Sequence, residues 1–336
     1  MKILIAGGAG FIGSTIASAC ADEGIQPVIL DNLVTGRREF TRGHEFYEGD
    51  IADGLLVDKI FAEHPDIYAT IDCAALIVVA ESTANPLRYY RENVAKGIVF
   101  LEHLARNDCS RLLFSSSASI YRADGEGAAV DEQSSVAPLS PYARTKAAFE
   151  MVLRDVAEAA LLRVISLRYF NPIGADPALR TGLARDSPTH ALGRMIDVHH
   201  DGDPFPITGT RWPTRDGTGL RDYVHVWDLA RAHVRAVRRF DEVTGAERYR
   251  AINLGTGDGI TVRELIGAFE SVTGDRLRTV ETVARPGDTA GAYTCTSLAR
   301  RLLDWAPELT LEDGIRDSLR WYARRAAVIG TDAASR

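Results

Sequence analysis

The chain has 336 residues, 46% of them hydrophobic, and carries a formal net charge of −7. That length and composition predict a soluble globular protein with a large core and room for two domains. The acidic balance gives no electrostatic footprint for nucleic acid, and no apolar run is long enough to span a membrane, so we expect a cytoplasmic protein that binds neither.

The pattern of the four cysteines and eight histidines argues against disulfides and metal sites. The cysteines are scattered, and the histidines lack the spacing that gathers metal ligands on one helix face. We therefore expect reduced thiols, no disulfide and no metal.

The first predicted elements are a strand, a glycine-rich turn and a helix. Residues 2–6 form a strand-like run that is apolar after Lys2, as in a fully buried parallel strand, and three glycines follow. In such a turn Gly7 permits the tight bend, Gly10 lets the backbone approach a pyrophosphate, and Gly13 allows close helix packing. A helix over 11–24 and the next apolar strand complete a βαβ unit, which predicts a dinucleotide-binding site.

Asp31 ends the second predicted strand, where a carboxylate can accept hydrogen bonds from both hydroxyls of an adenosine ribose. This position favours NAD over NADP, because a 2′-phosphate would meet the negative charge. Arg37 and Arg38 lie close to Asp31 in the sequence and could bind a 2′-phosphate, so NADP remains an alternative cofactor. The alternative role of Asp31 is to open a turn with Asn32.

Further strand-like runs continue the alternation of strands with helices. Helical patterns such as residues 86–107 separate the runs, which lie at residues 26–30, 68–73, 111–116 and 163–169. The alternation predicts an α/β fold with a doubly wound parallel sheet of the Rossmann type.

The texture of the chain changes after Tyr169 to turn-rich stretches with shorter elements. We expect an NAD-binding domain over residues 1–170 and a smaller C-terminal substrate-binding domain, mainly residues 171–330. Residues 219–255 are expected to return to the first domain, with Asp228 as the N-cap of a helix.

A catalytic group is predicted from Ser117, Tyr142 and Lys146. On a helix, Tyr142 and Lys146 lie four residues apart and share one face, so the ammonium can sit near the phenol. A tyrosine that acts as a base near pH 7 needs its pKa lowered from about 10 by roughly three units, or about 4 kcal/mol. The positive charges of Lys146 and of a cationic nicotinamide can stabilise the phenolate and so lower this pKa. Ser117 follows a buried strand, where it can hydrogen-bond a reacting hydroxyl.

With these motifs the chain resembles the extended short-chain dehydrogenase/reductases and, within them, the NAD-dependent UDP-sugar 4-epimerases. The match spans nearly the whole chain and includes GGAGFIG (7–13), SSSASIY (115–121), YARTK (142–146), LRYFNPIGA (167–175), DGTGLRDYVHVWDLA (216–230), NLGTG (253–257) and RPGD (285–288). The resemblance implies an isomerase that inverts C4 of a UDP-hexose through a transient 4-keto sugar, with NAD as the retained cofactor, and it implies a homodimer.

The resemblance also assigns residues to the two ligands. The implied cofactor contacts are Gly7, Gly10, Phe11, Ile12, Gly13, Asp31, Asn32, Asp50, Ile51, Ala74, Asn93, Ser115, Tyr142, Lys146 and Tyr169. The implied substrate contacts are Ser117, Tyr142, Asn171, Arg194, Thr208, Arg221, Arg285 and Asp288. Two arginines suit a diphosphate because guanidinium groups neutralise it with forked hydrogen bonds.

Several activities of related proteins remain as alternatives. Nucleotide-sugar dehydratases and decarboxylases begin with the same oxidation, but the carboxylic acid that they carry after the active-site hydroxyl is missing, since Ala118 and Ser119 follow Ser117. A non-catalytic NAD-binding regulator is a further alternative, which the intact Ser117, Tyr142 and Lys146 disfavour.

Arg194 decides the expected sugar. It resembles the arginine that meets the sugar carboxylate in UDP-glucuronate 4-epimerases, so we expect UDP-glucuronate and UDP-galacturonate as substrates. The alternative substrates are UDP-glucose and UDP-galactose. Ala292 is small and would leave room in the sugar pocket, so N-acetylated UDP-sugars are a further alternative. Ile77 and Arg122 depart from the family pattern, which puts cofactor affinity and the adjacent loop in doubt.

Overall fold

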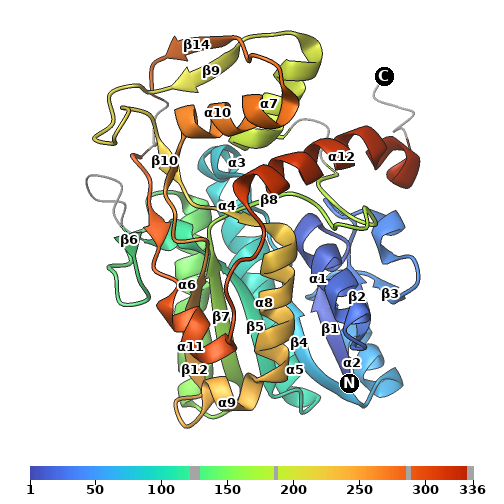
Figure 1. The fold of residues 1–336 in the computed structure, drawn as a ribbon. Coiled ribbons are helices and arrows are strands. Elements are labelled where there is room, and N and C mark those ends of the chain that lie inside the picture. The colour runs from blue at the N-terminus through green and yellow to red at the C-terminus, as the bar shows by residue number, and fades with distance from the viewer. Residues whose placement is uncertain (122–128, 185–187, 285–288, 331–336) are drawn as a thin grey trace.

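The computed structural model describes residues 1–121, 129–184, 188–284 and 289–330. Its centre is a parallel sheet of seven strands, which confirms the expected doubly wound α/β fold (Figure 1). In spatial order the strands are β12 (Tyr249–Leu254), β7 (Arg163–Tyr169), β5 (Arg111–Ser117), β4 (Ile67–Asp72), β1 (Lys2–Ala6), β2 (Gln26–Asp31) and β3 (Glu45–Glu48). The five runs predicted from the sequence are strands of this sheet, with ends that differ by one residue at most.

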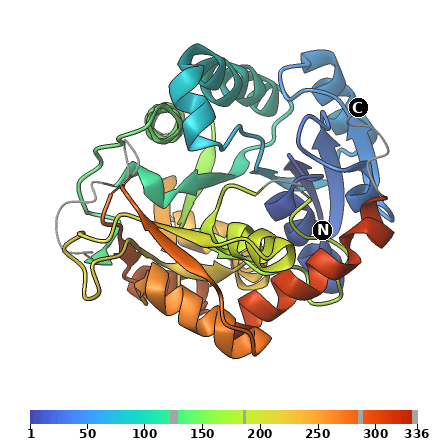
Figure 2. The same ribbon diagram turned by 90° about the horizontal axis from the view of Figure 1, so that it is seen from above.

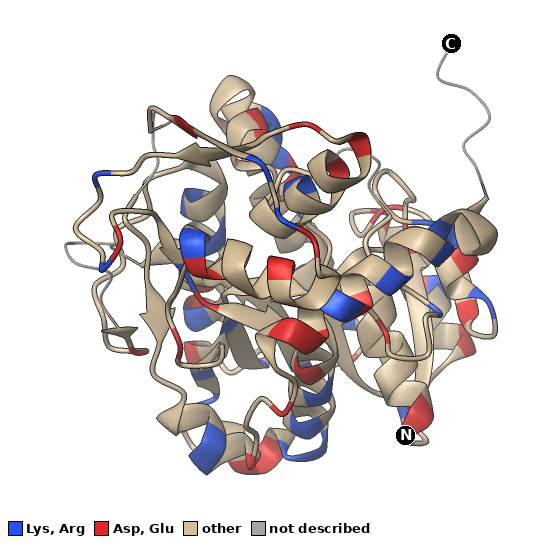
Figure 3. Ribbon diagram, turned by 45° about the horizontal axis from the view of Figure 1, so that its top comes forward, with Lys and Arg blue, Asp and Glu red and all other residues tan. Residues whose placement is uncertain are grey.

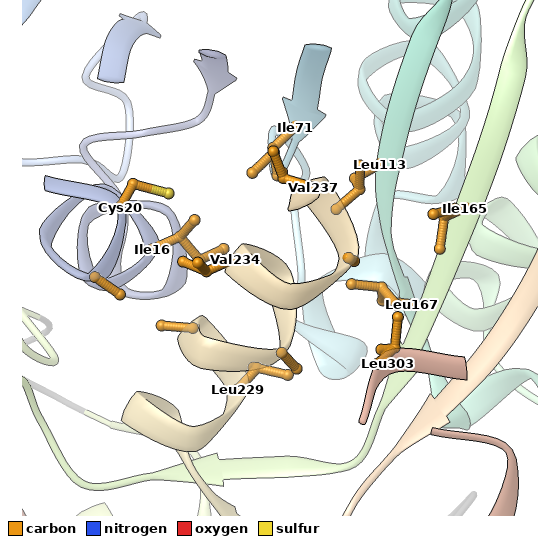
Figure 4. Close-up of a cluster of buried hydrophobic side chains, with 14 of the residues drawn as sticks. Ile16, Cys20, Ile71, Leu113, Ile165, Leu167, Leu229, Val234, Val237 and Leu303 are labelled. Carbon is orange, nitrogen blue, oxygen red and sulfur yellow. The ribbon is translucent and has the colours of Figure 1, made fainter. Parts of the chain in front are cut away.

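Apolar residues cover both faces of the sheet, which explains why its strands read as continuous hydrophobic runs. Phe240 and Val243 of α9 (Phe240–Thr244) belong to the cluster on one face of the sheet. There, buried side chains of the sheet also pack against three longer helices (Figure 4). These helices are α1 (Phe11–Asp22), α8 (Val226–Arg238) and α11 (Ser297–Leu303). A second cluster packs the other face against α2 (Gly54–Glu63), α5 (Lys96–Arg106) and α6 (Pro141–Glu158).

A smaller layer lies beyond the carboxyl ends of the strands and has a core of its own (Figure 1). Its elements are α7 (Ala191–Asp201), β9 (Phe205–Thr208), α10 (Val262–Thr273), β14 (Thr279–Thr282) and α12 (Leu311–Ile329). From this layer α12 reaches across to the N-terminal elements, where Trp321 packs on Phe40 with ring centroids 5.8 Å apart (Figure 2). The boundary at residue 170 stays a prediction.

Short elements connect the two layers. Three two-stranded pairs are β8 (Asn171–Ile173) with β11 (Tyr223–His225), β10 (Leu220–Arg221) with β13 (Ile260–Thr261), and β6 (Ala129–Val130) with β15 (Tyr293–Thr294). The remaining helical turns are η1 (Arg38–Thr41), α3 (Val79–Ala84), α4 (Pro86–Tyr90), η2 (Arg91–Ala95), η3 (Ala118–Ile120) and α9 (Phe240–Thr244).

Two local expectations need correction. The helical pattern over 86–107 is not one α-helix, because the π-helical turn η2 separates α4 from α5 and carries Asn93. The N-cap of α8 is His225 and not Asp228. Strand β11 runs directly into the helix, so the ring of His225 accepts the hydrogen bond from the Trp227 N–H, and the Asp228 carboxylate binds the N–H groups of Glu308 and Leu309.

Charge is spread over the fold. Acidic and basic residues are interspersed along the helices in the view of Figure 3. Within the described residues, no helix is both long and apolar enough to cross a membrane. Nor does that part of the chain gather three histidine, cysteine or acidic side chains into a group that could hold a metal ion. The four cysteines are free thiols, of which Cys20 and Cys109 are buried.

Candidate active site

The glycine turn between β1 and α1 has the geometry of an anion cradle. Gly7 has a φ of +74°, and a Cβ at Gly13 would stand 2.3 Å from the Gly7 carbonyl oxygen, so neither position tolerates a side chain. Gly10 caps α1 without a side-chain hydrogen bond, and the first turn has no acidic residue. The first N–H groups of α1 are therefore available to a pyrophosphate, and Phe11 and Ile12 lie in that turn.

Asp31 lies beside this turn, with a side chain that is 8% exposed. Its two oxygens accept hydrogen bonds from the N–H groups of Ala9 and Leu33, at 2.9 and 2.8 Å. Burial raises the pKa of the carboxyl, and these two bonds oppose the rise. Through its hydrogen bond with Ala9, Asp31 thus holds the glycine turn in place. Arg38, which kept NADP open, pairs with Glu48.

Two residues assigned to the cofactor are engaged by neighbouring protein groups. Asp50 accepts hydrogen bonds from Lys96 at 2.6 Å and from Asn32 at 3.2 Å. The Asn93 amide binds both backbone groups of Leu76, at 2.8 and 2.9 Å, and donates to Thr145 at 3.1 Å. Asn93 therefore ties the segment after β4 to α6. Ile51 is buried, and Ala74 is the second residue of that segment.

The catalytic group predicted from the sequence is assembled between β5 and α6. Ser140 caps α6 by accepting the Ala143 N–H, which starts the helix just before Tyr142. The Tyr142 hydroxyl hydrogen-bonds Ser117, at the end of β5. Ser117 also lies 2.9 Å from Ser119, measured between the two hydroxyl oxygens.

The electrostatics of Tyr142 differ from the expectation in one respect. Burial raises the pKa of Tyr142, and the bond to Ser117 opposes the rise. The Lys146 ammonium donates to the Ser115 carbonyl at 2.7 Å and lies 4.6 Å from the centre of the Phe114 ring. Burial lowers the pKa of Lys146 to about 8. The protein surroundings alone therefore favour the neutral phenol.

Tyr169 completes the group at the end of β7. Tyr169 is partly buried, its hydroxyl hydrogen-bonds the Ser115 side chain, and burial raises its pKa well above the usual value. The hydroxyl oxygen of Ser115 also lies 3.0 Å from the Cys73 sulfur. The carboxyl ends of β1, β2, β4, β5 and β7 thus bring the cofactor and catalytic candidates to one edge of the sheet.

The structure distributes the substrate candidates over the second layer. Asn171 begins β8, Thr208 ends β9, and Arg221 lies in β10, where its guanidinium donates to the Leu220 carbonyl at 2.6 Å. Arg194 is exposed on α7. Arg285 and Asp288 lie outside the described residues, as does Arg122.

A buried ion pair next to the catalytic helix was missed by the sequence reasoning. Glu150 lies one helical turn after Lys146 and binds Arg168 of β7, with 2.9 Å between Oε1 and Nε, and the two side chains are 3% and 1% exposed. Ser116 donates to Glu150, and Arg168 donates to the Tyr121 hydroxyl at 2.8 Å. The available signal was an acidic residue four positions after Lys146 on an otherwise buried helix face. This pair fastens α6 to β5 and β7.

Comparisons with known proteins give the chain its relatives. A model of the NAD dependent epimerase/dehydratase family matches residues 3–255. Over 326 residues the chain is 39% identical to a UDP-glucose 4-epimerase of Rhizobium leguminosarum bv. trifolii, covering 96% of this chain and 97% of that protein.

Solved structures agree with this relationship. A UDP-glucose 4-epimerase from Stenotrophomonas maltophila, with bound NAD and formylated UDP-arabinopyranose, has a TM-score of 0.92 and 35% identity over 97% of this chain and 99% of that one. The enzyme of the same name from Bifidobacterium longum, in complex with NAD⁺ and UDP, has a TM-score of 0.89 and 31% identity over 98% and 100% of the two chains.

The buried ion pair yields a stability prediction. Replacement Glu150→Gln leaves the Arg168 guanidinium buried without its counter-charge, so we expect a loss of about 3–5 kcal/mol in the free energy of unfolding. Denaturant unfolding measures it. Glu158→Gln, an exposed change on the same helix, is the control and should alter stability by less than about 0.5 kcal/mol. Equal unfolding midpoints for the two variants would contradict a structural role for the pair.

Proposed function

Because the chain belongs to the NAD-dependent epimerase/dehydratase family, within which it is a UDP-sugar 4-epimerase, we propose that it interconverts UDP-glucose and UDP-galactose. The observation that carries this substrate is the similarity to UDP-glucose 4-epimerases over nearly the full length of both chains. NAD is the cofactor, and the unsubstituted glycine turn with the open first turn of α1 suits its pyrophosphate.

The expected preference for a uronate has no support from these relatives. On α7 the nearby carboxylate that interacts with the charge of Arg194 belongs to Asp197, one turn further along the helix. A solvated helix face accounts for this arginine. UDP-glucose, the alternative expected from the sequence, therefore becomes the proposed substrate.

The proposed chemistry rests on Tyr142 as the base. Tyr142 takes the proton of the sugar 4-hydroxyl, and Ser117, its hydrogen-bond partner, orients that hydroxyl. When bound, NAD⁺ would supply the acceptor for the C4 hydride and, once reduced, the donor that restores it, with a 4-ketone between the two transfers. Tyr142 then gives its proton back to the oxygen on C4.

Inversion requires that the ketone turn over between the two transfers. Asn171 and Arg221, together with Arg285 and Asp288 outside the described residues, are proposed to hold the UDP portion, remote from C4. The sugar ring is then free to present its opposite face while the nucleotide stays bound. Ser119 provides no acid at the position where dehydratases and decarboxylases carry a carboxylate, which favours epimerisation over elimination.

A homodimer is proposed from exposed apolar side chains on adjacent helices. Leu87 on α4, Ile98 on α5 and Met151 on α6 are 78%, 38% and 66% exposed. Side chains of this size are costly to leave in water when several gather on neighbouring elements. A second copy of this chain is the proposed partner.

Removing the base tests the catalytic assignment. We expect Tyr142→Phe to lower kcat for UDP-glucose by about 10²–10⁴-fold, because a positioned base contributes that much, while NAD remains bound. The assay couples formation of UDP-galactose to a galactose-specific readout, and denaturation followed by chromatography measures bound NAD. Tyr68→Phe, a hydroxyl removed near the amino end of β4, should turn over normally. Undiminished activity of Tyr142→Phe would remove it as the base.

Separate assays with three UDP-sugars test the substrate. We expect UDP-glucose to exceed UDP-glucuronate by about tenfold or more in kcat/KM, and Arg194→Ala to behave like the exposed control Arg276→Ala. UDP-N-acetylglucosamine is the second candidate, because Ala292, which packs against the cluster of Ile120, Tyr121 and Val130, occupies little space. Faster turnover of UDP-glucuronate, lost selectively in Arg194→Ala, would overturn the proposal and reinstate the uronate.

Light scattering tests the dimer. The wild type should have twice the mass of one chain, and Leu87→Glu combined with Met151→Glu should halve it, because two carboxylates would be buried unpaired at the interface. Val280→Glu places the same charge on β14 and should leave the mass unchanged. A wild type of monomer mass would refute the proposal.

A further inference from the structure

A buried carboxylate ends the central strand of the sheet. Asp72, the last residue of β4, is 3% exposed and stands in register with Ala6 of β1 and Phe114 of β5. One of its oxygens accepts the Ala74 N–H at 3.0 Å. Enclosing a carboxylate between apolar neighbours is costly unless a positive charge lies close to it.

Strand register places Asp72 on the face of the sheet where the Lys146 ammonium lies. Paired residues of parallel strands direct their side chains to the same face of the sheet, so Asp72 lies on the face of Phe114. The Lys146 ammonium lies 4.6 Å from the centre of the Phe114 ring and binds the carbonyl of the next residue, Ser115. The ammonium and the carboxylate therefore lie at the same edge of β4 and β5, on the same face of the sheet.

The charges of the two groups support each other. Burial lowers the pKa of Lys146 to about 8, and the charge of Asp72 is the strongest influence that opposes it. Burial raises the pKa of Asp72 to about 6, and the charge of Lys146 opposes that rise in turn. Each group thus keeps the other ionised near neutral pH.

Other titratable groups near Lys146 do not provide this counter-charge. On α6, Glu150 is paired with Arg168, and burial keeps Tyr142 protonated. After β4, burial raises the pKa of the Cys73 thiol to about 12, and on β7 burial raises the pKa of Tyr169 well above its usual value. Among the described neighbours, Asp72 is the carboxylate that faces Lys146 without a second cation of its own.

We propose that Asp72 is a positioning residue for the epimerase reaction, holding Lys146 in its ammonium form beside Tyr142. The proposal rests on the role of Lys146 in the proposed function. A bound nicotinamide brings a second positive charge to this edge and so disfavours the ammonium, while a neutral amine would give Tyr142 no stabilisation of its phenolate. Asp72 offsets that repulsion.

The small number of lysines allows a direct measurement. The chain has four lysines, at positions 2, 59, 96 and 146, so protein labelled with ¹³C at lysine Cε gives four titrating NMR signals. Lys146→Arg identifies the signal of interest. With NAD⁺ bound, we expect Asp72→Asn to lower the midpoint of the Lys146 titration by about one to three pH units relative to wild type.

Two further variants keep the measurement decisive. Asp72→Ser retains an oxygen for the Ala74 N–H and replaces Asp72→Asn if that variant does not fold. Asp228→Asn removes another fully buried carboxylate, distant from Lys146 in the hydrogen-bond network, and should leave the midpoint in place. An unchanged midpoint in the folded Asp72 variant, or an equal fall in Asp228→Asn, would overturn the proposal.

Kinetics supply the second readout. The alkaline limb of the kcat profile reports loss of the lysine proton, so in Asp72→Asn it should move to lower pH while KM for UDP-glucose stays near the wild-type value. A general packing defect would lower kcat at every pH without moving that limb, which would also refute the proposal. Because the NMR titration requires no turnover, its result is independent of which UDP-sugar the enzyme uses.

Discussion

Parallel pairing of β1, β4, β5 and β7 is the constraint on which the rest of the structure depends. Because these strands run in one direction, their carboxyl ends share one edge, and the residues that end or follow them meet there. The glycine turn, Asp72, Ser117 and Tyr169 reach the same place from distant parts of the chain. Apolar packing on both faces makes this edge a poor environment for charge.

The chemistry of the site follows from how that charge is managed. Glu150 and Arg168 neutralise each other behind the catalytic helix and fix its position. At the edge of the sheet, the charges of Lys146 and Asp72 stabilise each other, whereas burial alone would favour the neutral form of both groups. Tyr142 remains a neutral phenol in these surroundings and depends on added positive charge to become a base. In the proposed mechanism the positive charge of the bound cofactor therefore contributes to the proton chemistry as well as to the oxidation.

The strands were predictable from the sequence because a parallel sheet covered on both faces needs continuous apolar runs. The grouping of Ser117, Tyr142 and Lys146 at one edge of the sheet was partly predictable, because helical spacing brings Tyr142 and Lys146 to one face. Interactions between side chains of distant segments were not predictable. Examples are Glu150 with Arg168 and Asp72 with Lys146. The π-turn at Asn93 and the cap at His225 depend on tertiary contacts that local propensity does not contain. The uronate substrate expected from Arg194 has no support from the relatives, because an arginine can bind a ligand carboxylate or simply lie on a solvated helix face.

The fate of the hydrogen on C4 tests the central claim most directly. UDP-glucose deuterated at C4 is turned over in ordinary water with unlabelled NADH in solution, and the UDP-galactose formed is analysed by mass spectrometry and NMR. Oxidation and return within one retained cofactor predicts full retention of deuterium at C4 on the inverted carbon. Loss of the label to water or to the added NADH would contradict the account.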